Sequence, residues 1–171
     1  MKIFQTQLQG LINKLGDHED VMEDAARVMA QSIISDGHLW IFAEKDMRGV
    51  LYQATEGADS LPSVEAATKE SSFSPMDCLL VFSSDLGSTV VSELIKRAQD
   101  NGVQVIGVSS TGDDDGVVMC SFHIPTGIKR GLVPTDDGGR MGEPHLLMAL
   151  HIYYSLFFTV KEILEEYELG I

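Results

Sequence analysis

Three short runs of almost purely apolar residues constrain the fold of this chain more than any other feature. They are residues 38–43 (HLWIFA), 77–82 (DCLLVF) and 103–108 (VQVIGV). Strands that face solvent on one side alternate apolar and polar residues, whereas strands covered on both faces are continuously apolar. Continuous runs of this kind are typical of parallel sheets, and we therefore expect a parallel sheet at the centre of the protein.

Segments with the periodicity of amphipathic helices lie before, between and after these runs. Two helices are predicted within residues 1–36, the first ending at Gly16 and the second capped by Asp17. A weak strand near 63–67 and a last strand over 117–124 complete the pattern. The alternation of strands and helices predicts an α/β fold, a three-layer α-β-α sandwich with a mostly parallel five-stranded sheet.

The 171 residues, of which 44% are hydrophobic, are enough to bury one sizeable core. We expect a single domain over residues 1–171. It comprises a helical pair (1–36), an α/β core (37–124) and, after a passage rich in glycine and proline, a long C-terminal helix (144–168).

The balance of charge argues against some classes of partner. With 26 acidic and 12 basic side chains the formal net charge is -14, which repels nucleic acids and anionic membrane surfaces. The N-terminus does not resemble a secretory signal, so a cytoplasmic location is expected. The longest apolar run, 146–160, is shorter than the ~20 residues that span a bilayer and is predicted to be a buried core helix.

Neither the cysteines nor the acidic loops predict a metal. Cys78 and Cys120 each lie in an apolar run without Cys-x-x-Cys spacing and are expected to be small, reduced core residues. The acidic loops 113–115 and 136–137 offer carboxylates for a hard cation, but surface loops of this composition are more common. No metal and no cofactor is predicted.

The carboxyl ends of the strands are the expected ligand site, because open parallel sheets bind ligands there. Three loops follow these ends: 44–48 (EKDMR), 83–89 (SSDLGST) and 109–112 (SSTG). In the middle loop Gly87 allows close approach of the backbone, and the free N–H groups of the next helix favour an anion. The alternative is that a hydroxyl of this loop merely caps the helix. The candidate ligand-binding residues are Ser83, Ser84, Gly87, Ser88, Thr89, Ser109, Ser110, Lys45 and Arg48.

Residues 77–111 run from an apolar strand through a serine-rich turn, a helix and a glycine to a second apolar strand with a hydroxyl-rich end. This order resembles the central signature of sugar isomerase (SIS) domains. The flanking helices are similar to those of small stand-alone members, the phosphoheptose isomerases. The resemblance implies that the turn 83–89 holds a phosphorylated sugar or similar small anion. It also implies a homodimer or homotetramer assembled through the flanking helices.

The departures from this family are also informative. The phosphoheptose isomerases have a glycine-rich loop where this chain has residues 44–48, so a different ligand or a narrower pocket is implied. Their zinc is held by a His and a Glu of the next helix with a Gln and a His of the last helix. The corresponding segment here, VLYQATEGAD, has no histidine. Glu143 stands at the position of the family's glutamine if His151 is aligned with its final histidine.

Aldose–ketose isomerisation requires a base beside the carbon next to a carbonyl, and the candidates are Glu44, Glu143 and His151. In a helix Glu143 and His151 would lie about 80° apart and could address one site. The alternatives are that Glu143 only complements a helix dipole and that His151 is a core or interface residue. His145 is predicted to serve a different face.

Two functions follow from this sequence. The first is a phosphosugar-binding SIS-domain protein that isomerises a sugar phosphate in the manner of phosphoheptose isomerases. The second is a non-catalytic phosphosugar-sensing module of the same fold that has lost the isomerase metal site. An oligomeric scaffold with a vestigial pocket is a third interpretation. Dinucleotide and nucleoside triphosphate functions are disfavoured, because the glycine-rich loops that they require are absent.

Overall fold

The computed structural model describes residues 1–112 and 115–170 of the chain. Five strands form one sheet in the order β2-β1-β3-β4-β5, and every neighbouring pair is parallel. The strands are β1 (Leu39–Ala43), β2 (Val64–Ala66), β3 (Cys78–Phe82), β4 (Gln104–Ser109) and β5 (Phe122–Pro125). The predicted parallel sheet is therefore confirmed.

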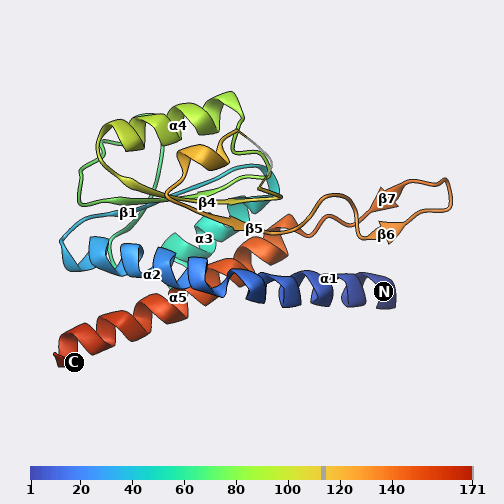
Figure 1. The fold of residues 1–171 in the computed structure, drawn as a ribbon, viewed down its shortest axis with the longest axis horizontal. Helices are drawn as coiled ribbons and strands as arrows, with labels where there is room; N and C mark the ends of the chain where they lie inside the picture. The colour runs from blue at the N-terminus through green and yellow to red at the C-terminus, as the bar shows by residue number, and fades with distance from the viewer. Residues whose placement is uncertain (113–114, 171) are drawn as a thin grey trace.

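Helices cover both faces of this sheet (Figure 1). One face carries α4, and the other carries α2, α3 and α5. The helices are α1 (Lys2–Leu15), α2 (Glu19–Ile34), α3 (Arg48–Glu56), α4 (Thr89–Asp100) and α5 (His145–Leu169). This arrangement confirms the three-layer α-β-α fold.

The central strand β3 shows why the apolar runs are continuous. Its residues Leu80 and Phe82 belong to the core under α2, α3 and α5, whereas Leu79 and Val81 belong to the core under α4. All five residues of β3 are buried. Full burial of one such side chain stabilises a fold by about 1.5–3 kcal/mol, so both faces of the strand must be apolar.

Two local predictions are wrong. The run 117–124 is not one strand: Val117–Met119 form a 3-10 turn that packs beside α4, and β5 begins only at Phe122. A short apolar run cannot by itself distinguish a strand from a turn that covers the core. Asp17 does not cap the second helix, because residues Gly16–His18 form a 3-10 turn and α2 begins at Glu19 without a side-chain cap.

Helix α5 is the one helix in the described ranges that is long and apolar enough to cross a membrane. Length and composition alone are weak evidence for a membrane span, and the inner face of α5 packs against α2 and α3 as in a core helix. Ile152, Tyr153 and Leu156 on that face are fully buried. The Tyr153 hydroxyl donates a hydrogen bond to the backbone carbonyl of Asp59, with 2.6 Å between the two oxygens.

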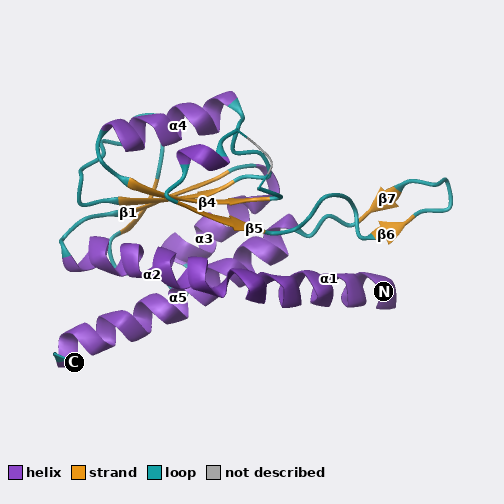
Figure 2. Cartoon of the chain, viewed as in Figure 1, coloured by secondary structure: helices purple, strands orange, loops and turns teal. Residues whose placement is uncertain are grey.

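An arm of residues 126–144 joins β5 to α5 and extends away from the sheet (Figure 2). Its outer part is an antiparallel hairpin of β6 (Val133–Pro134) and β7 (Arg140–Met141). The Arg140 guanidinium donates to the carbonyls of Gly131 and Leu132, which ties the base of the hairpin together. The glycine- and proline-rich passage expected between strand and helix thus contains a hairpin that the sequence pattern does not predict.

Candidate functional site at the carboxyl edge of the sheet

The sheet register brings together residues that follow three different strands. Ala43 of β1 pairs with Phe82 of β3, which pairs with Val108 of β4. The next residues, Glu44, Ser83 and Ser109, are neighbours at the carboxyl edge. The Ser83 hydroxyl donates a hydrogen bond to the Glu44 carboxylate. Two of the three candidate loops therefore meet at this edge of the sheet.

The hydroxyl of Ser83 is directed into the protein. Ser83 is fully buried, and its oxygen also lies 2.8 Å from the carbonyl oxygen of Asp85. It accepts a hydrogen bond from the Asp85 N–H at 3.1 Å. Ser83 therefore holds the turn in shape, and its hydroxyl is already engaged with Glu44 and the turn backbone.

Ser109 is likewise fully buried at the end of β4. Its hydroxyl oxygen lies 2.8 Å from Nε2 of His123 and 2.9 Å from the carbonyl oxygen of Thr111. His123 belongs to β5 and is a polar residue of this edge that the sequence analysis missed. The alternation of His123 with the buried Ile124 is the available signal, but a longer apolar strand over 117–124 conceals it.

The outer part of the turn is formed by Gly87, Ser88 and Thr89. Gly87 and Thr89 are exposed, and Ser84 and Ser88 are half-buried. The N–H of Gly87 donates to Oδ1 of Asp85 at 2.9 Å, so one backbone amide of the turn is engaged internally. A Cβ on Gly116 would lie 2.2 Å from the Leu86 carbonyl oxygen, which shows how closely a neighbouring loop presses on this turn.

Ser88 occupies the N-cap position of α4 but makes no side-chain cap hydrogen bond. Its hydroxyl oxygen is buried and has no hydrogen-bond partner in residues 1–112 and 115–170. The first N–H groups of any helix have no partner within the helix. The anticipated alternative, that Ser88 merely caps α4, does not match this geometry.

The loop after β1 has an unusual backbone. Lys45 adopts a left-handed conformation with φ of 54°, which is uncommon for a residue other than glycine. Lys45 and Arg48 are both exposed, and Glu44 is half-buried. The loop therefore carries two exposed positive charges and the exposed carboxylate of Asp46. Ser110, in the loop after β4, is half-buried, and its carbonyl accepts the N–H of Gly127 at 2.9 Å.

Glu143 and His151 do not lie as a continuous helix would place them. Glu143 precedes α5, and Pro144 at the N-cap position has non-helical dihedral angles. The exposed Glu143 carboxylate lies 3.3 Å from Nε2 of His145, the first residue of α5. The prediction that Glu143 belongs to the first helical turn is therefore wrong, and its neighbour is His145.

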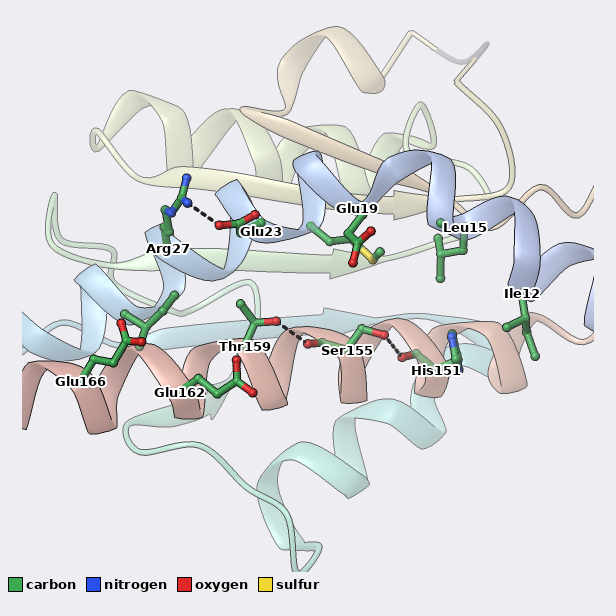
Figure 3. Close-up of a pocket in the computed structure, with 13 residues that line it drawn as sticks. Ile12, Leu15, Glu19, Glu23, Arg27, His151, Ser155, Thr159, Glu162 and Glu166 are labelled. Atoms are coloured by element: carbon green, nitrogen blue, oxygen red, sulfur yellow. Dashed lines mark hydrogen bonds and ion pairs between the residues drawn. The ribbon is translucent and has the colours of Figure 1, made fainter.

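His151 lines a groove between α5 and the pair α1–α2 (Figure 3). The groove has a volume of about 570 Å³, and Glu143 is not among its lining residues. Ser155 and Thr159 continue the α5 wall, and Leu15 belongs to the facing wall near His151. Its charged lining residues are Glu19, Glu23, Arg27, Glu162 and Glu166. None of residues 83–89 lines this groove, so His151 and the turn 83–89 do not share it.

The residues present do not fit the zinc set of phosphoheptose isomerases. Helix α3 has no histidine, and the described residues contain no group of three or more metal-binding side chains. The Asp137 carboxylate is engaged by Thr135 and the Gly139 N–H. Asp113 and Asp114 of the other acidic loop lie outside the described residues. The two cysteines, one buried and one half-buried, are not joined by a disulfide.

Comparison with solved structures identifies this architecture as the SIS fold. The phosphoheptose isomerase GmhA from Neisseria gonorrhoeae superposes with a TM-score of 0.66 at 12% identity, covering 91% of this chain and 94% of that chain. The sugar isomerase domain of the RpiR transcription factor from Sphaerobacter thermophilus superposes with a TM-score of 0.60 at 9% identity, covering 95% of this chain and 96% of that one.

Comparison of sequences places the chain more narrowly. It is 39% identical over 171 residues to the Uncharacterized protein YwjG of Bacillus subtilis (strain 168), covering 98% of this chain and 99% of that protein. The family profile described as Domain of unknown function (DUF2529) matches residues 1–164. With its SIS fold and a profile match over nearly its whole length, this chain belongs to the DUF2529 family.

Proposed function

We propose that this protein binds a phosphorylated sugar at the turn 83–89, with the phosphate against the N-terminus of α4. The SIS fold and its neighbours, which include a phosphoheptose isomerase and the sugar isomerase domain of a transcription factor, support this class of ligand. The free N–H groups of the first turn of α4 and the helix dipole favour an anion at this position.

The observation that carries the proposal is the unpaired hydroxyl of Ser88. A buried polar group without a partner costs about 1–3 kcal/mol. A serine at the N-cap would normally remove this cost by bonding to the second or third helical N–H, but Ser88 does not. A phosphate oxygen at the turn would accept from Ser88 and from the adjacent backbone N–H groups. Ser84 and Thr89 are the other hydroxyls available to it.

The turn also has a feature that limits its affinity for anions. The Asp85 carboxylate accepts a hydrogen bond from the N–H of Gly87, a group that would otherwise be available to an anion. The exposed Lys45 and Arg48 in the adjacent loop supply the opposing positive charge. We infer that the turn accepts one phosphate rather than a more highly charged group.

The finer proposal is a sugar-phosphate isomerase of the phosphoheptose isomerase type. Its alternative is a non-catalytic phosphosugar-sensing module. The absence of a histidine from α3 favours the alternative, since half of the metal set is missing. The Glu44 carboxylate favours the isomerase, because it is hydrogen-bonded to Ser83 of the turn and can take part in proton transfer.

The ligand proposal is tested by thermal denaturation in the presence of sugar phosphates and inorganic phosphate. A ligand at 100 times its dissociation constant stabilises the protein by about 2.7 kcal/mol. We expect the double substitution Ser84→Ala and Ser88→Ala to abolish this stabilisation while Ser92→Ala, one turn farther along α4, retains it. Stabilisation that survives the double substitution places the ligand elsewhere, and no stabilisation by any phosphate contradicts the proposal.

We further propose that the chain acts as one domain in the cytoplasm and assembles as a homodimer or homotetramer. Large apolar side chains are exposed on the flanking helices: Ile3 on α1, and Leu147 and Phe158 on α5. Exposed apolar residues on neighbouring helices are typical of surfaces that associate. The acidic net charge argues against nucleic acid and anionic membranes as partners.

A further inference from the structure

The groove between α5 and the pair α1–α2 has the length of a helix. On α5 its lining residues run from His151 to Glu166, and on the facing wall they run from Ile12 to Arg27. Ile12 stands near His151 at one end, and Arg27 stands near Glu166 at the other (Figure 3). Residues 151–166 of a helix cover about 22 Å, the length of four helical turns. An elongated groove between helices is a shape that accepts a further helix along its length.

An apolar strip runs within this groove. It consists of the lining residues Ile12, Leu15, Met22 and Ile163. Leu15 is buried, whereas the other three are half-buried and pack against the main core with their inner surfaces. Their remaining surface faces water, and covering it with apolar groups of a partner is favourable. The strip is therefore a place where a partner can bury apolar side chains.

Carboxylates lie along both walls beside the apolar strip. Glu19 and Glu23 belong to α2, and both are exposed. Glu162 and Glu166 belong to α5 and are also exposed. Residues four apart lie on the same side of a helix, so each pair follows one wall. Arg27, the basic residue of the lining, is already paired with Glu23. Within residues 1–112 and 115–170, Glu19, Glu162 and Glu166 have no ion-pair partner.

The hydroxyls of the α5 wall add hydrogen-bond acceptors rather than donors. Ser155 donates to the carbonyl of His151 at 3.0 Å, and Thr159 donates to the carbonyl of Ser155 at 3.1 Å. A hydroxyl has one hydrogen, so these two oxygens have only lone pairs left for a partner. Ionised carboxylates also accept without donating. This wall therefore favours a partner rich in N–H donors and positive charge, as Lys and Arg side chains are.

We propose that this groove is the docking site for a basic amphipathic helix of a partner protein. Apolar side chains of that helix, spaced three and four residues apart, cover the apolar strip, and its Lys or Arg side chains reach the carboxylates of both walls. Leu147 and Phe158, proposed above for assembly, do not line the groove, and neither does any residue of the turn 83–89. The docking site is thus separate from the phosphosugar site and does not depend on it.

The test uses the full chain and a fluorescent peptide of about 14 residues, which matches the groove in length when helical. Leucine stands at every third or fourth position of this peptide, and lysine and glutamine fill the others. A second peptide has the same composition in scrambled order. The amphipathic peptide should bind about 10-fold more tightly than the scrambled one in fluorescence anisotropy. Equal binding of the two peptides would reveal attraction by net charge alone and overturn the inference.

Charge reversal inside the groove is matched by charge reversal outside it. Glu162→Lys combined with Glu166→Lys should weaken binding of the amphipathic peptide by about 10-fold or more, because like charges then face each other. Glu165→Lys combined with Glu168→Lys changes the net charge equally on the same helix, at exposed positions that do not line the groove. This control should bind the peptide much more tightly than the groove variant. Equal losses in the two proteins contradict the proposed site.

Ile12→Gln and Met22→Gln test the apolar strip without changing the charge. Each should weaken binding of the amphipathic peptide and leave binding of the scrambled peptide unchanged. Thermal denaturation identifies the variants that are folded, and wild-type affinity in both folded variants overturns the inference. Light scattering without peptide distinguishes the other occupant. If either variant lowers the mass of the protein, a second copy of this chain fills the groove and the proposed partner helix is wrong.

Discussion

The hydroxyl of Ser83 and the carboxylate of Glu44 are hydrogen-bonded across the carboxyl ends of β3 and β1. The two residues are 39 positions apart in the sequence, so the bond ties two loops of the candidate site together. Ser83→Ala also leaves the Asp85 N–H without its acceptor. We expect Ser83→Ala to lower the free energy of unfolding by about 1–3 kcal/mol, measured by urea denaturation.

A double-mutant cycle separates this bond from the individual side chains. Glu44→Gln keeps an acceptor for Ser83 and should cost less than Glu44→Ala. The coupling between Ser83→Ala and Glu44→Ala should be about 0.5 kcal/mol or more. Asp46→Ala, at an exposed position in the same loop, should stay within about 0.5 kcal/mol of the wild type. Strict additivity of the first two substitutions would mean that the bond contributes nothing to stability.

Gly116 is expected to be intolerant of a side chain. Its Cβ would overlap the backbone carbonyl of Leu86, which cannot move aside without shifting the turn. Gly116→Ala should therefore lower the melting temperature and weaken phosphate binding together. Gly10→Ala in α1, where no atom lies within 4 Å, is the control. It should raise stability by about 0.5–1 kcal/mol. A Gly116→Ala protein with wild-type stability would contradict the close contact.

Asp77, at the amino end of the sheet, should make the free energy of unfolding depend on pH. Burial alone raises the pKa of its carboxyl group, but hydrogen bonds from the N–H groups of His38 and Ser74 and from the Trp40 indole outweigh it and hold the pKa below its usual value. The unfolded chain therefore binds this proton more readily than the folded one. The stabilisation is complete above the unfolded pKa of about 3.9 and is lost as pH falls through the folded pKa.

The measurement compares the wild type with Asp77→Asn by chemical denaturation between about pH 7 and about pH 3. Asp77→Asn should cost about 1–3 kcal/mol near neutral pH, because the amide replaces the carboxylate imperfectly in this network. The difference between the two proteins should narrow as the solution becomes acidic. A difference that stays constant over this range would show that Asp77 does not titrate at an altered pKa.

If the chain assembles through α5, a charge on the exposed face of this helix should weaken the assembly. Phe158 is 59% exposed, so Phe158→Glu should not disturb the core of one chain. It should weaken association and lower the mass measured by light scattering at micromolar concentration. Tyr52→Glu, on the exposed face of α3, should leave the mass unchanged. A wild-type protein that is monomeric under these conditions would contradict the assembly.

The layers of the fold can be predicted from the sequence because burial on both faces leaves a strong pattern. In β3 every position must be apolar, and its continuous run is recognisable for that reason. The segment 117–124 misleads because Val117 and Met119 pack onto the core from a turn rather than from a strand. The hairpin of β6 and β7 escapes prediction because its two-residue strands are too short to show alternation.

The site is harder to predict, because it depends on backbone angles. The expected convergence of Glu143 and His151 assumes one continuous helix through Pro144, whose φ of -84° and ψ of 50° turn Glu143 toward His145 instead. The inward direction of the Ser83 hydroxyl and the unpaired state of Ser88 depend on tertiary contacts that composition does not encode. What the sequence can indicate is the location of the hydroxyl-rich turn at the carboxyl edge of the sheet.

The arm that carries β6 and β7 is the covalent link between the sheet and α5. Its tip, residues 135–139 between β6 and β7, stands clear of the packed layers in Figure 2, and the helix that follows supplies much of one face of the interior. Cleavage of the chain at the tip would therefore separate α5 covalently from the sheet without removing a core contact. The two fragments would remain associated through α5, with the Tyr153 hydroxyl still bonded to Asp59. The tip is thus the natural place for a split-protein design.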